Sequence, residues 1–281
     1  MSTLYLVGTP IGNLEDMTFR ALRVLQEVSV VAAEDTRRAR VLFAHFGIET
    51  PLMSYHEQGN QSARLAAVLR RLSEADVALI SEAGMPSISD PGFGLVRAAL
   101  EQGAKVEVVP GPSAVTVALA VSALPTDRFL FLGFLPRTSA QRRRTLLEVK
   151  ELPYSVILLE SPHRVQACLR DLTAALGDRR IAVCREMTKL HEEVFRGSIS
   201  GALEHFTETR GEFTLVVEGA TAVPAHATDQ NVAERLQGLV AGGMSVRDAV
   251  AQVAEESGRP KKDVYRVSLE IKAVASAFRS P

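Results

Sequence analysis

Short apolar runs alternate with segments of helical period through the first part of the chain. Runs rich in Val, Ile and Leu predict strands at 4–8, 30–35, 77–81 and 105–111. Apolar residues spaced three and four apart predict helices at 19–28, 38–47, 63–72 and 93–103. Gly103 is suited to be the C-terminal cap of the last of these helices. This alternation is typical of an α/β fold with a largely parallel sheet.

The second part of the chain repeats the alternation with more strand. A helix at 112–124 is predicted to open with Pro112 and Ser113. Further helices are predicted at 140–150 and 164–177, and strands at 129–136, 155–161, 181–187, 192–197 and 213–219. The last three strand-like runs follow one another closely, so this half is also expected to be α/β, with more β-rich pairing towards its end.

The pattern divides the chain into three regions. We expect an N-terminal α/β domain at 1–111, a second α/β domain at 112–223 and a small helical domain at 229–281. Residues 220–229 mix Pro, Ala, Thr and His and are predicted to be a linker. The helical region contains three short amphipathic segments, 232–243, 246–258 with Ser245 as its N-cap, and 261–278. A chain of 281 residues suits two main cores at roughly 150 residues per domain.

Composition narrows the class of protein. Hydrophobic residues make up 46% and charged residues 23%, as in soluble globular proteins. No apolar run approaches the ~20 residues that span a bilayer, and no secretory signal is visible, so we expect a cytoplasmic protein. The two cysteines, Cys168 and Cys184, are far from any His/Cys cluster and are expected to be reduced core thiols. The net charge of -1 means that a nucleic-acid site would need local positive charge.

Three loops follow predicted strands of the first domain and carry unusual chemistry. In the first loop, Gly8 and Gly12 are spaced so that neither phosphate-binding fingerprint, G-x-G-x-x-G or G-x-x-x-x-G-K-[ST], fits. The second loop, in the stretch 78–92, is rich in Gly and Pro and crowds Ser, Glu and Asp side chains together. The third, 108–115, again leads from a strand into a helix. Ligands of open α/β sheets bind at the carboxyl ends of strands, so we expect the three loops to form one pocket.

The set of motifs resembles a known family. GTPIGNLEDMT, AEDTR, SEAGMPSISDPG, PGPSAV, GFLPR, ESPHRV and REMTKLHEE occur in the order and spacing of the bacterial 16S ribosomal RNA (cytidine-2'-O)-methyltransferases, within the tetrapyrrole methylase superfamily. The resemblance covers about residues 4–219, and the C-terminal helical segment is similar to the small extra domain of that family. It implies two α/β domains with S-adenosylmethionine (SAM) between them, usually in a homodimer, and 16S rRNA of the small ribosomal subunit as substrate.

The resemblance also implies which residues contact SAM. They are Pro10, Gly12, Ser81, Glu82, Ala83, Gly84, Met85, Pro112, Ser113, Ala114, Phe134 and Thr214. SAM carries a sulfonium, a zwitterionic methionine end and an adenosine, but no phosphate, so loops without a phosphate-binding Lys suit it. This sequence has SEAGMP where the family usually has SDAGTP, which lengthens one acidic side chain at Glu82 and replaces a hydroxyl at Met85.

Methyl transfer to a ribose hydroxyl needs positioning and assistance from a base or a nearby cation. Polar groups just after predicted strands are the candidates, and the sequence does not rank them. Each could equally belong to a surface ion pair or a helix cap. The catalytic candidates are Glu34, Asp35, Arg37, Glu160, His163, Arg164, Glu186 and Lys189.

Contact with RNA phosphates requires clustered positive charge. Basic residues gather in three segments, although such runs are often only solvated helix faces. The predicted RNA contacts are Arg38, Arg40, Arg137, Arg142, Arg143, Arg144, Lys261, Lys262 and Arg266. The segment 245–273 is similar to a helix-turn-helix unit, and we expect it to help bind the ribosomal subunit.

Two other functions remain open from the sequence. A C-methyltransferase of a tetrapyrrole precursor would share the scaffold, because a fold does not fix the substrate. Such proteins typically begin with a G-x-G-P-G loop, whereas this chain has GTPIG and a basic helical C-terminus. A non-catalytic RNA-binding factor for ribosome assembly is the second alternative, which the intact cofactor loops disfavour. The loop spacing disfavours an NAD- or ATP-dependent enzyme. No metal site is indicated.

Overall fold

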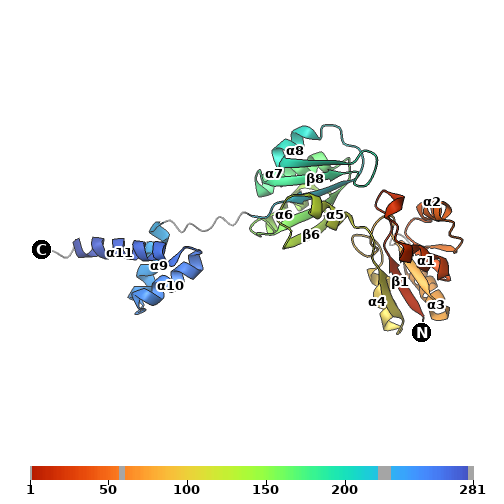
Figure 1. The fold of residues 1–281 in the computed structure, drawn as a ribbon, viewed down its shortest axis with the longest axis horizontal. Helices are drawn as coiled ribbons and strands as arrows, with labels where there is room; N and C mark the ends of the chain where they lie inside the picture. The colour runs from red at the N-terminus through yellow and green to blue at the C-terminus, as the bar shows by residue number, and fades with distance from the viewer. Residues whose placement is uncertain (1, 57–60, 221–228, 278–281) are drawn as a thin grey trace. The chain divides into compact units, whose positions relative to one another are not determined.

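The computed structural model describes residues 2–56, 61–220 and 229–277, which fall into two compact units, Met1–Gly219 and Ala220–Pro281. The first unit contains two five-stranded sheets (Figure 1). All strand pairs of the first sheet are parallel. Its order is β3 (Leu52–Ser54), β2 (Val30–Ala33), β4 (Val77–Ile80), β1 (Thr3–Val7) and β5 (Lys105–Val109).

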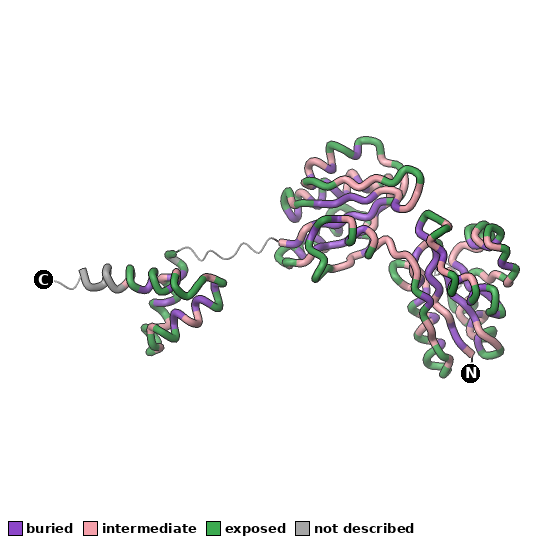
Figure 2. The backbone as a smooth tube through the Cα atoms, viewed as in Figure 1, coloured by how far each residue is buried: buried purple, intermediate pink, exposed green. Residues whose placement is uncertain are grey.

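Helices cover both faces of the first sheet. One apolar cluster joins the sheet to α1 (Phe19–Glu27) and α2 (Thr36–Phe46), and a second joins its other face to α3 (Gln61–Glu74) and α4 (Phe93–Glu101). The strand β4 is buried along its whole length, which explains its unbroken run of apolar residues. Figure 2 shows buried backbone concentrated along the strands. The predicted parallel α/β architecture is confirmed.

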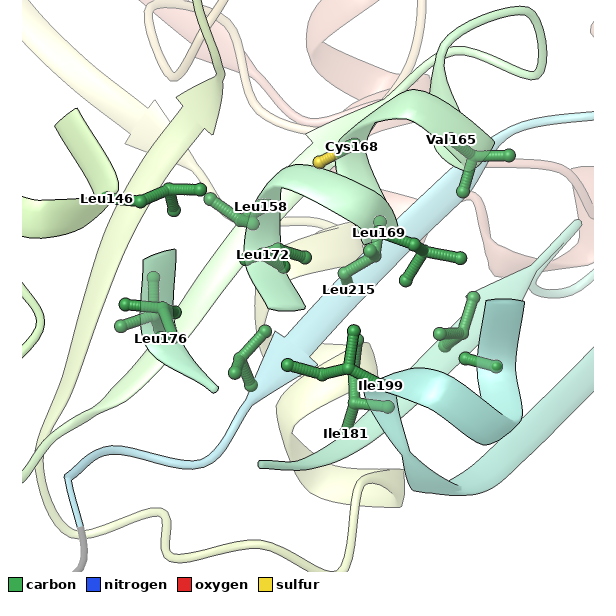
Figure 3. Packing of buried hydrophobic residues seen from close by; sticks show 14 of the residues in the cluster. Leu146, Leu158, Val165, Cys168, Leu169, Leu172, Leu176, Ile181, Ile199 and Leu215 are labelled. Atoms are coloured by element: carbon green, nitrogen blue, oxygen red, sulfur yellow. The ribbon is translucent and has the colours of Figure 1, made fainter. Parts of the chain in front are cut away.

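The second sheet is mixed. Its order is β6 (Phe129–Phe134), β7 (Ser155–Glu160), β10 (Phe213–Val217), β8 (Arg180–Arg185) and β9 (Glu193–Ser198). The strands β6 and β7 pair in parallel, and the three later strands pair antiparallel. The expected β-rich pairing towards the end of this region is confirmed, and its antiparallel direction is added by the structure. One face packs against α6 (Ser139–Glu148), α7 (Val165–Leu176) and α8 (Ile199–His205), whose Leu and Ile side chains meet those of the strands (Figure 3).

The other face of the second sheet carries α5 (Ala114–Val121), the helix that follows β5 of the first sheet. Its Ala118 and Leu119 pack with Ile157 and Val216 of the strands beneath. Ile11, from the loop after β1, belongs to the same cluster. An apolar residue of the first α/β region is therefore buried against the second sheet, which brings the loops of the first sheet next to the strands of the second.

The second unit is a small helical bundle. It contains α9 (Asp229–Ala241), α10 (Val246–Ser257) and α11 (Lys261–Ala277) around a core that includes Val232, Leu236 and Val253. Ser245 caps α10 by accepting a hydrogen bond from the Asp248 N–H, as predicted. The predicted linker falls mainly on residues 221–228, which lie outside the described part of the chain.

Some elements differ from the sequence prediction. The residue pattern did not predict β3, the 3-10 turn Leu14–Asp16 or α8, all of which are short. Gly103 follows the C-cap Gln102 with φ +76, and its N–H donates to the Leu100 carbonyl, so it terminates α4 as predicted. Both cysteines are free and buried, in separate apolar clusters. No helix in the described residues is long and apolar enough to cross a membrane.

Candidate functional site

The three loops after β1, β4 and β5 meet at the carboxyl end of the first sheet. The N–H of Thr9 donates to the Gly84 carbonyl at 2.9 Å, and the Gly84 N–H donates back to the Thr9 carbonyl at 3.0 Å. A Cβ on Gly8 would lie 2.7 Å from the Gly111 nitrogen, so the first and third loops touch backbone to backbone. Glycine is required here because any side chain would separate the loops.

A cavity of about 330 Å³ lies beside these loops and confirms the expectation that they form one pocket. Strands of the second sheet complete its wall through Phe131, Leu159 and Thr214. Of the predicted cofactor residues, those that line it are Glu82, Ala83, Gly84, Met85, Ser113, Ala114, Phe134 and Thr214. Pro10, Gly12 and Ser81 line a smaller cavity of about 200 Å³ that shares Ile11, Arg38, Glu82, Ala83 and Glu212 with it. The Pro112 carbonyl oxygen lies 3.5 Å from the position of a Cβ on Gly84.

The lining of this first cavity suits a ligand without phosphates. Much of it is apolar, with Phe131, Phe134 and Met187 among the lining residues. Glu160 is almost completely buried, and its Oε1 accepts from the Ser161 N–H at 2.8 Å. Its Oε2 lies 3.4 Å from an Arg164 nitrogen and has no hydrogen-bond partner among the described residues. That oxygen is available to accept a hydrogen bond from a bound molecule.

A second cavity of about 850 Å³ lies next to the first. Its lining is mostly polar and consists of Glu34, Asp35, Thr36, Arg37, Ser54, His56, Glu82, Ser89, Asp90 and Pro91. Among the described residues, only Glu82 and Asp90 line both cavities. These two carboxylates therefore form the wall between a mostly apolar cavity and a polar one.

Charge pairs organise this region. Glu82 makes an ion pair with Arg38 of α2 at 2.8 Å. Asp35 caps α2 by accepting from the Arg37 N–H, and the Arg37 side chain binds its carboxylate at 2.7 Å. Hydrogen bonds from Arg37 hold the pKa of Asp35 well below its ordinary value. The pKa of Asp90 is raised to about 6, chiefly by burial. A hydrogen bond from Ser81 lowers this pKa, and the charge on Glu82 raises it.

The predicted catalytic candidates are dispersed among these features. Glu34, Asp35 and Arg37 line the second cavity and Glu160 lines the first. Lys189 lines the small third cavity, where its ammonium pairs with Glu186 at 2.9 Å and with Glu212 at 3.0 Å.

The other candidates are not among the residues that line these three cavities. His163 is exposed in the connection before α7, and Arg164 donates to the Leu135 carbonyl at 2.7 Å. Burial would raise the pKa of Glu186, but hydrogen bonds from Lys189 and the Glu212 N–H keep it below its ordinary value. The structure therefore does not bring the eight candidates together in one site.

The loop that contains Glu186 and Lys189 contacts the first loop closely. Glu186 and Thr188 have φ values of +50 and +66, which side-chain-bearing residues rarely adopt. The Thr188 hydroxyl accepts from the Asn13 N–H at 3.0 Å, and a Cβ on Gly12 would lie 2.9 Å from the Met187 carbonyl oxygen. This loop therefore fixes the first loop against the second sheet.

The basic residues predicted to contact RNA differ in exposure. Arg142 is only 4% exposed, and its guanidinium binds the Asp171 carboxylate at 2.9 and 2.6 Å. The prediction that Arg142 contacts RNA is therefore wrong, because the buried carboxylate already occupies the side chain. The exposed members of the set are Arg38, Arg40, Arg137, Arg143, Arg144, Lys261, Lys262 and Arg266.

Sequence reasoning did not assign Asp90 or His56 to a site. Asp90 was one of several polar residues in the stretch 78–92, and nothing in the residue order distinguishes it from its neighbours. What distinguishes Asp90 in the structure is the backbone just before it, where Ser87 and Ser89 have φ values of +70 and +60. His56 follows β3, a strand too short to predict, so its place at the sheet edge was hidden.

Comparison with known proteins shows which family the chain is similar to. Residues 3–202 match the family described as Tetrapyrrole (Corrin/Porphyrin) Methylases, and residues 226–272 match the RsmI C-terminal HTH domain. Proteins named Ribosomal RNA small subunit methyltransferase I are similar to it over most of its length. The one from Halalkalibacterium halodurans is 43% identical and covers 94% of each chain. The one from Synechocystis sp. is 44% identical and covers 97% of this chain and 99% of its own.

Solved structures share the fold. A uroporphyrin-III C-methyltransferase from Thermus thermophilus, complexed with S-adenyl homocysteine, has a TM-score of 0.57 at 22% identity. It covers 77% of this chain and 97% of its own. A diphthine synthase has a TM-score of 0.61 at 14% identity, covering 78% and 90%. At such low identity these likenesses concern the arrangement of the sheets and helices only.

Proposed function

We propose, because the chain belongs to the tetrapyrrole methylase family, that it is a methyltransferase acting on ribosomal RNA of the small subunit. The donor is SAM and the acceptor is the 2'-hydroxyl of a cytidine in 16S rRNA. The observation that carries this proposal is the mostly apolar cavity where the three loops meet. The relatives named Ribosomal RNA small subunit methyltransferase I, which match nearly the full chain, support it.

The residues of the first cavity fit SAM. The volume of about 330 Å³ lies within the usual range of roughly 300–1,000 Å³ for ligand pockets. Phe131 and Phe134 offer aromatic surface for an adenine. The Oε2 of Glu160 has no hydrogen-bond partner among the described residues and can accept a hydrogen bond, although it lies 3.4 Å from Arg164. No Lys is among the described residues that line the cavity, which suits a ligand without phosphates. Bound SAM supplies an electrophilic methyl carbon on a sulfur that leaves as a neutral thioether.

The chain's own contribution to the reaction is positioning. The acceptor oxygen must be held roughly 3 to 3.5 Å from the methyl carbon and in line with the leaving sulfur. The close contacts between Gly8 and Gly111 and between Gly12 and the loop after β8 fix the three loops relative to the second sheet. Because these loops are held together, SAM bound in the first cavity would keep one position relative to Glu82 and Asp90.

The direct test uses small ribosomal subunits that lack the modification. The protein is incubated with these subunits and radiolabelled SAM, and the RNA is digested to nucleosides for mass spectrometry. We expect one 2'-O-methylcytidine per subunit. Measurable SAM binding without transfer to RNA would contradict the proposal and favour a small-molecule acceptor.

A cavity-blocking variant with a matched control links this activity to the site. Ala114→Trp places a large side chain in the first cavity, and we expect it to abolish both SAM binding and transfer. Leu147→Trp makes a comparable change on α6 at a 54% exposed position, and it should retain both. Full activity of Ala114→Trp would contradict the placement of the cofactor.

The C-terminal unit is proposed to strengthen binding to the subunit. Lys262 and Arg266 are exposed and lie four residues apart on α11, so they share one face of the helix. The exposed Tyr265 beside them offers an aromatic surface, as in other RNA-binding sites. This part of the chain also matches the RsmI C-terminal HTH domain.

The double variant Lys262→Glu/Arg266→Glu tests that role. We expect weaker subunit binding and a shallower dependence of affinity on salt, with SAM affinity unchanged. Lys150→Glu/Arg170→Glu makes the same charge change at two exposed positions on the first unit and serves as the control. Equal effects of the two double variants would contradict a specific role of α11.

The quaternary state and compartment are part of the proposal. We propose a homodimer that resides in the cytoplasm. The homodimer is consistent with large exposed apolar side chains on α4 and the edge strand β5, at Phe93, Leu100 and Val108. Light scattering should give twice the chain mass for the native protein and a lower mass for Phe93→Asp/Leu100→Asp. A native monomer would contradict the homodimer.

A further inference from the structure

Resting on the proposed function, we propose that the second cavity holds the acceptor nucleotide and that Asp90 accepts the proton of its 2'-hydroxyl. Donor and acceptor must meet within bonding reach, so the reacting groups belong where the two cavities adjoin. Of the residues that the structure describes, only Asp90 and Glu82 line both. The reaction centre is therefore expected at this wall.

Of the two carboxylates, Asp90 is the one free to act as a base. Glu82 is held by Arg38 at 2.8 Å, so its carboxylate already has a cationic partner. No cation is paired with Asp90 in the part of the chain that the structure describes. Burial raises the pKa of Asp90 to about 6, close to the pH at which the reaction must run, where a general base is most effective.

The backbone around Asp90 supports a functional placement. Ser87 and Ser89 have φ values of +70 and +60, and strained residues of this kind concentrate at active sites. A Cβ on Gly92 would lie 2.1 Å from the Ser87 oxygen, and one on Gly133 of β6 would lie 2.7 Å from the Ser89 oxygen. These two glycines leave room for the side chains of Ser87 and Ser89, which precede Asp90 in the loop.

The second cavity suits a nucleoside. Its volume of about 850 Å³ can hold a base and its sugar, and its lining is rich in hydrogen-bonding groups. Carboxylates can accept from the exocyclic amine of a cytosine, and Glu34 supplies a carboxylate to this lining. Besides Asp90, the titratable and charged residues in the described lining of the two cavities are Glu34, Asp35, Arg37, His56, Glu82, Arg38, Glu160 and Glu212.

The proton and electrons balance in one step. The Asp90 carboxylate takes the proton from the 2'-hydroxyl while that oxygen forms its bond to the methyl carbon. The carbon–sulfur bond breaks at the same time, and its electron pair stays on the sulfur, which becomes neutral. Asp90 then releases the proton to solvent through the second cavity, so that no further reactant is needed.

The first experiment is Asp90→Asn in the full chain. We expect the turnover number for subunit methylation to fall by roughly 100- to 10,000-fold, while the dissociation constant for SAM changes less than about threefold. In the native protein kcat/KM should rise with pH to a plateau with its midpoint near 6, because the base acts unprotonated. The variant should lose this rise. Asp127→Asn, at an exposed aspartate, is the matched control and should keep native rate and pH profile.

A measurement without turnover tests the same residue. The ¹³C carboxyl resonance of Asp90 in the cofactor-free protein should titrate near pH 6. A native rate in Asp90→Asn, or a loss of SAM affinity equal to the loss of rate, would overturn the assignment. A native protein that transferred no methyl to the subunit would contradict the proposed function. A native protein that does transfer it, with an equally active Asp90→Asn variant, would contradict only the role of Asp90.

The acceptor cavity is tested separately. Ser54→Trp at the end of β3 fills the second cavity, and we expect at least a tenfold loss of kcat/KM for the subunit with SAM affinity unchanged. Ser73→Trp, in α3 and outside both cavities, is the control and should behave like the native protein. A native kcat/KM for Ser54→Trp would overturn the placement of the acceptor.

Discussion

Replacing Arg142 by Met tests whether this residue serves the core rather than RNA. Its guanidinium is buried between α6 and α7, donates to Asp171 at 2.9 and 2.6 Å, and donates to the Arg137 carbonyl at 2.8 Å. The substitution keeps most of the side-chain volume and removes these hydrogen bonds, together with a longer one to the Pro136 carbonyl at 3.4 Å. It leaves a buried carboxylate without its main partner.

The structure sets the expected size of the effect. Removing one partner of a buried ion pair costs about 3–5 kcal/mol, chiefly because the other charge remains buried. Asp171 keeps the Ser139 hydroxyl at 2.7 Å and Arg143 at 3.7 Å, so we expect a loss of about 3 kcal/mol in the free energy of unfolding. The double variant Arg142→Met/Asp171→Leu removes both charges and should lie within about 1 kcal/mol of the native protein.

Urea unfolding followed by circular dichroism measures these differences, and amide exchange in α7 locates them. Arg144→Met is the matched control, because the Arg144 side chain is 86% exposed and its loss should change stability by less than about 0.5 kcal/mol. Equal stability of Arg142→Met and Arg144→Met would refute the structural role. So would a double variant as unstable as the single one.

Three further predictions concern other parts of the chain. Gly12→Ala should destabilise the protein by about 1–3 kcal/mol and weaken SAM binding measured by calorimetry, because its Cβ would meet a backbone carbonyl of the loop after β8. Cys168 and Cys184 should not react with a thiol reagent at pH 8 until the protein unfolds, because burial raises their pKa values to about 12 and about 11. Arg37→Gln should raise the pKa of Asp35 in an NMR titration. Since the native pKa is depressed, the pair's contribution to stability is present at neutral pH and is lost as the pH falls below about 4.

The cofactor loops could be predicted from sequence because their signal is local. A buried strand followed by Gly and Pro marks the carboxyl edge of a parallel sheet wherever it occurs. The contacts between Gly8 and Gly111 and between Thr9 and Gly84 then follow from the adjacency of the strands β1, β4 and β5. Strand order was not predicted, but any order that placed these three strands side by side would bring their loops together.

The roles of individual charged residues could not be predicted in the same way. Arg142, Arg143 and Arg144 are consecutive and chemically identical, yet their side chains are 5%, 50% and 86% exposed. The difference arises from Asp171, which is far away in sequence and lies opposite only once α6 packs on α7. A run of Arg on a helix therefore does not say which of its members faces solvent until the partner helix is known.

The same reasoning explains why the wall between the cavities was hidden. Glu82 and Asp90 lie in one loop, and either could be a base on residue type alone. Arg38, from the helix after β2, pairs with Glu82 and not with Asp90. A long-range ion pair thus occupies one carboxylate, while burial raises the pKa of the other. The family's usual Asp at position 82 would be one methylene shorter. We infer that Glu82 reaches Arg38 through this extra length, which makes the separation of the two carboxylates' roles a property of this sequence.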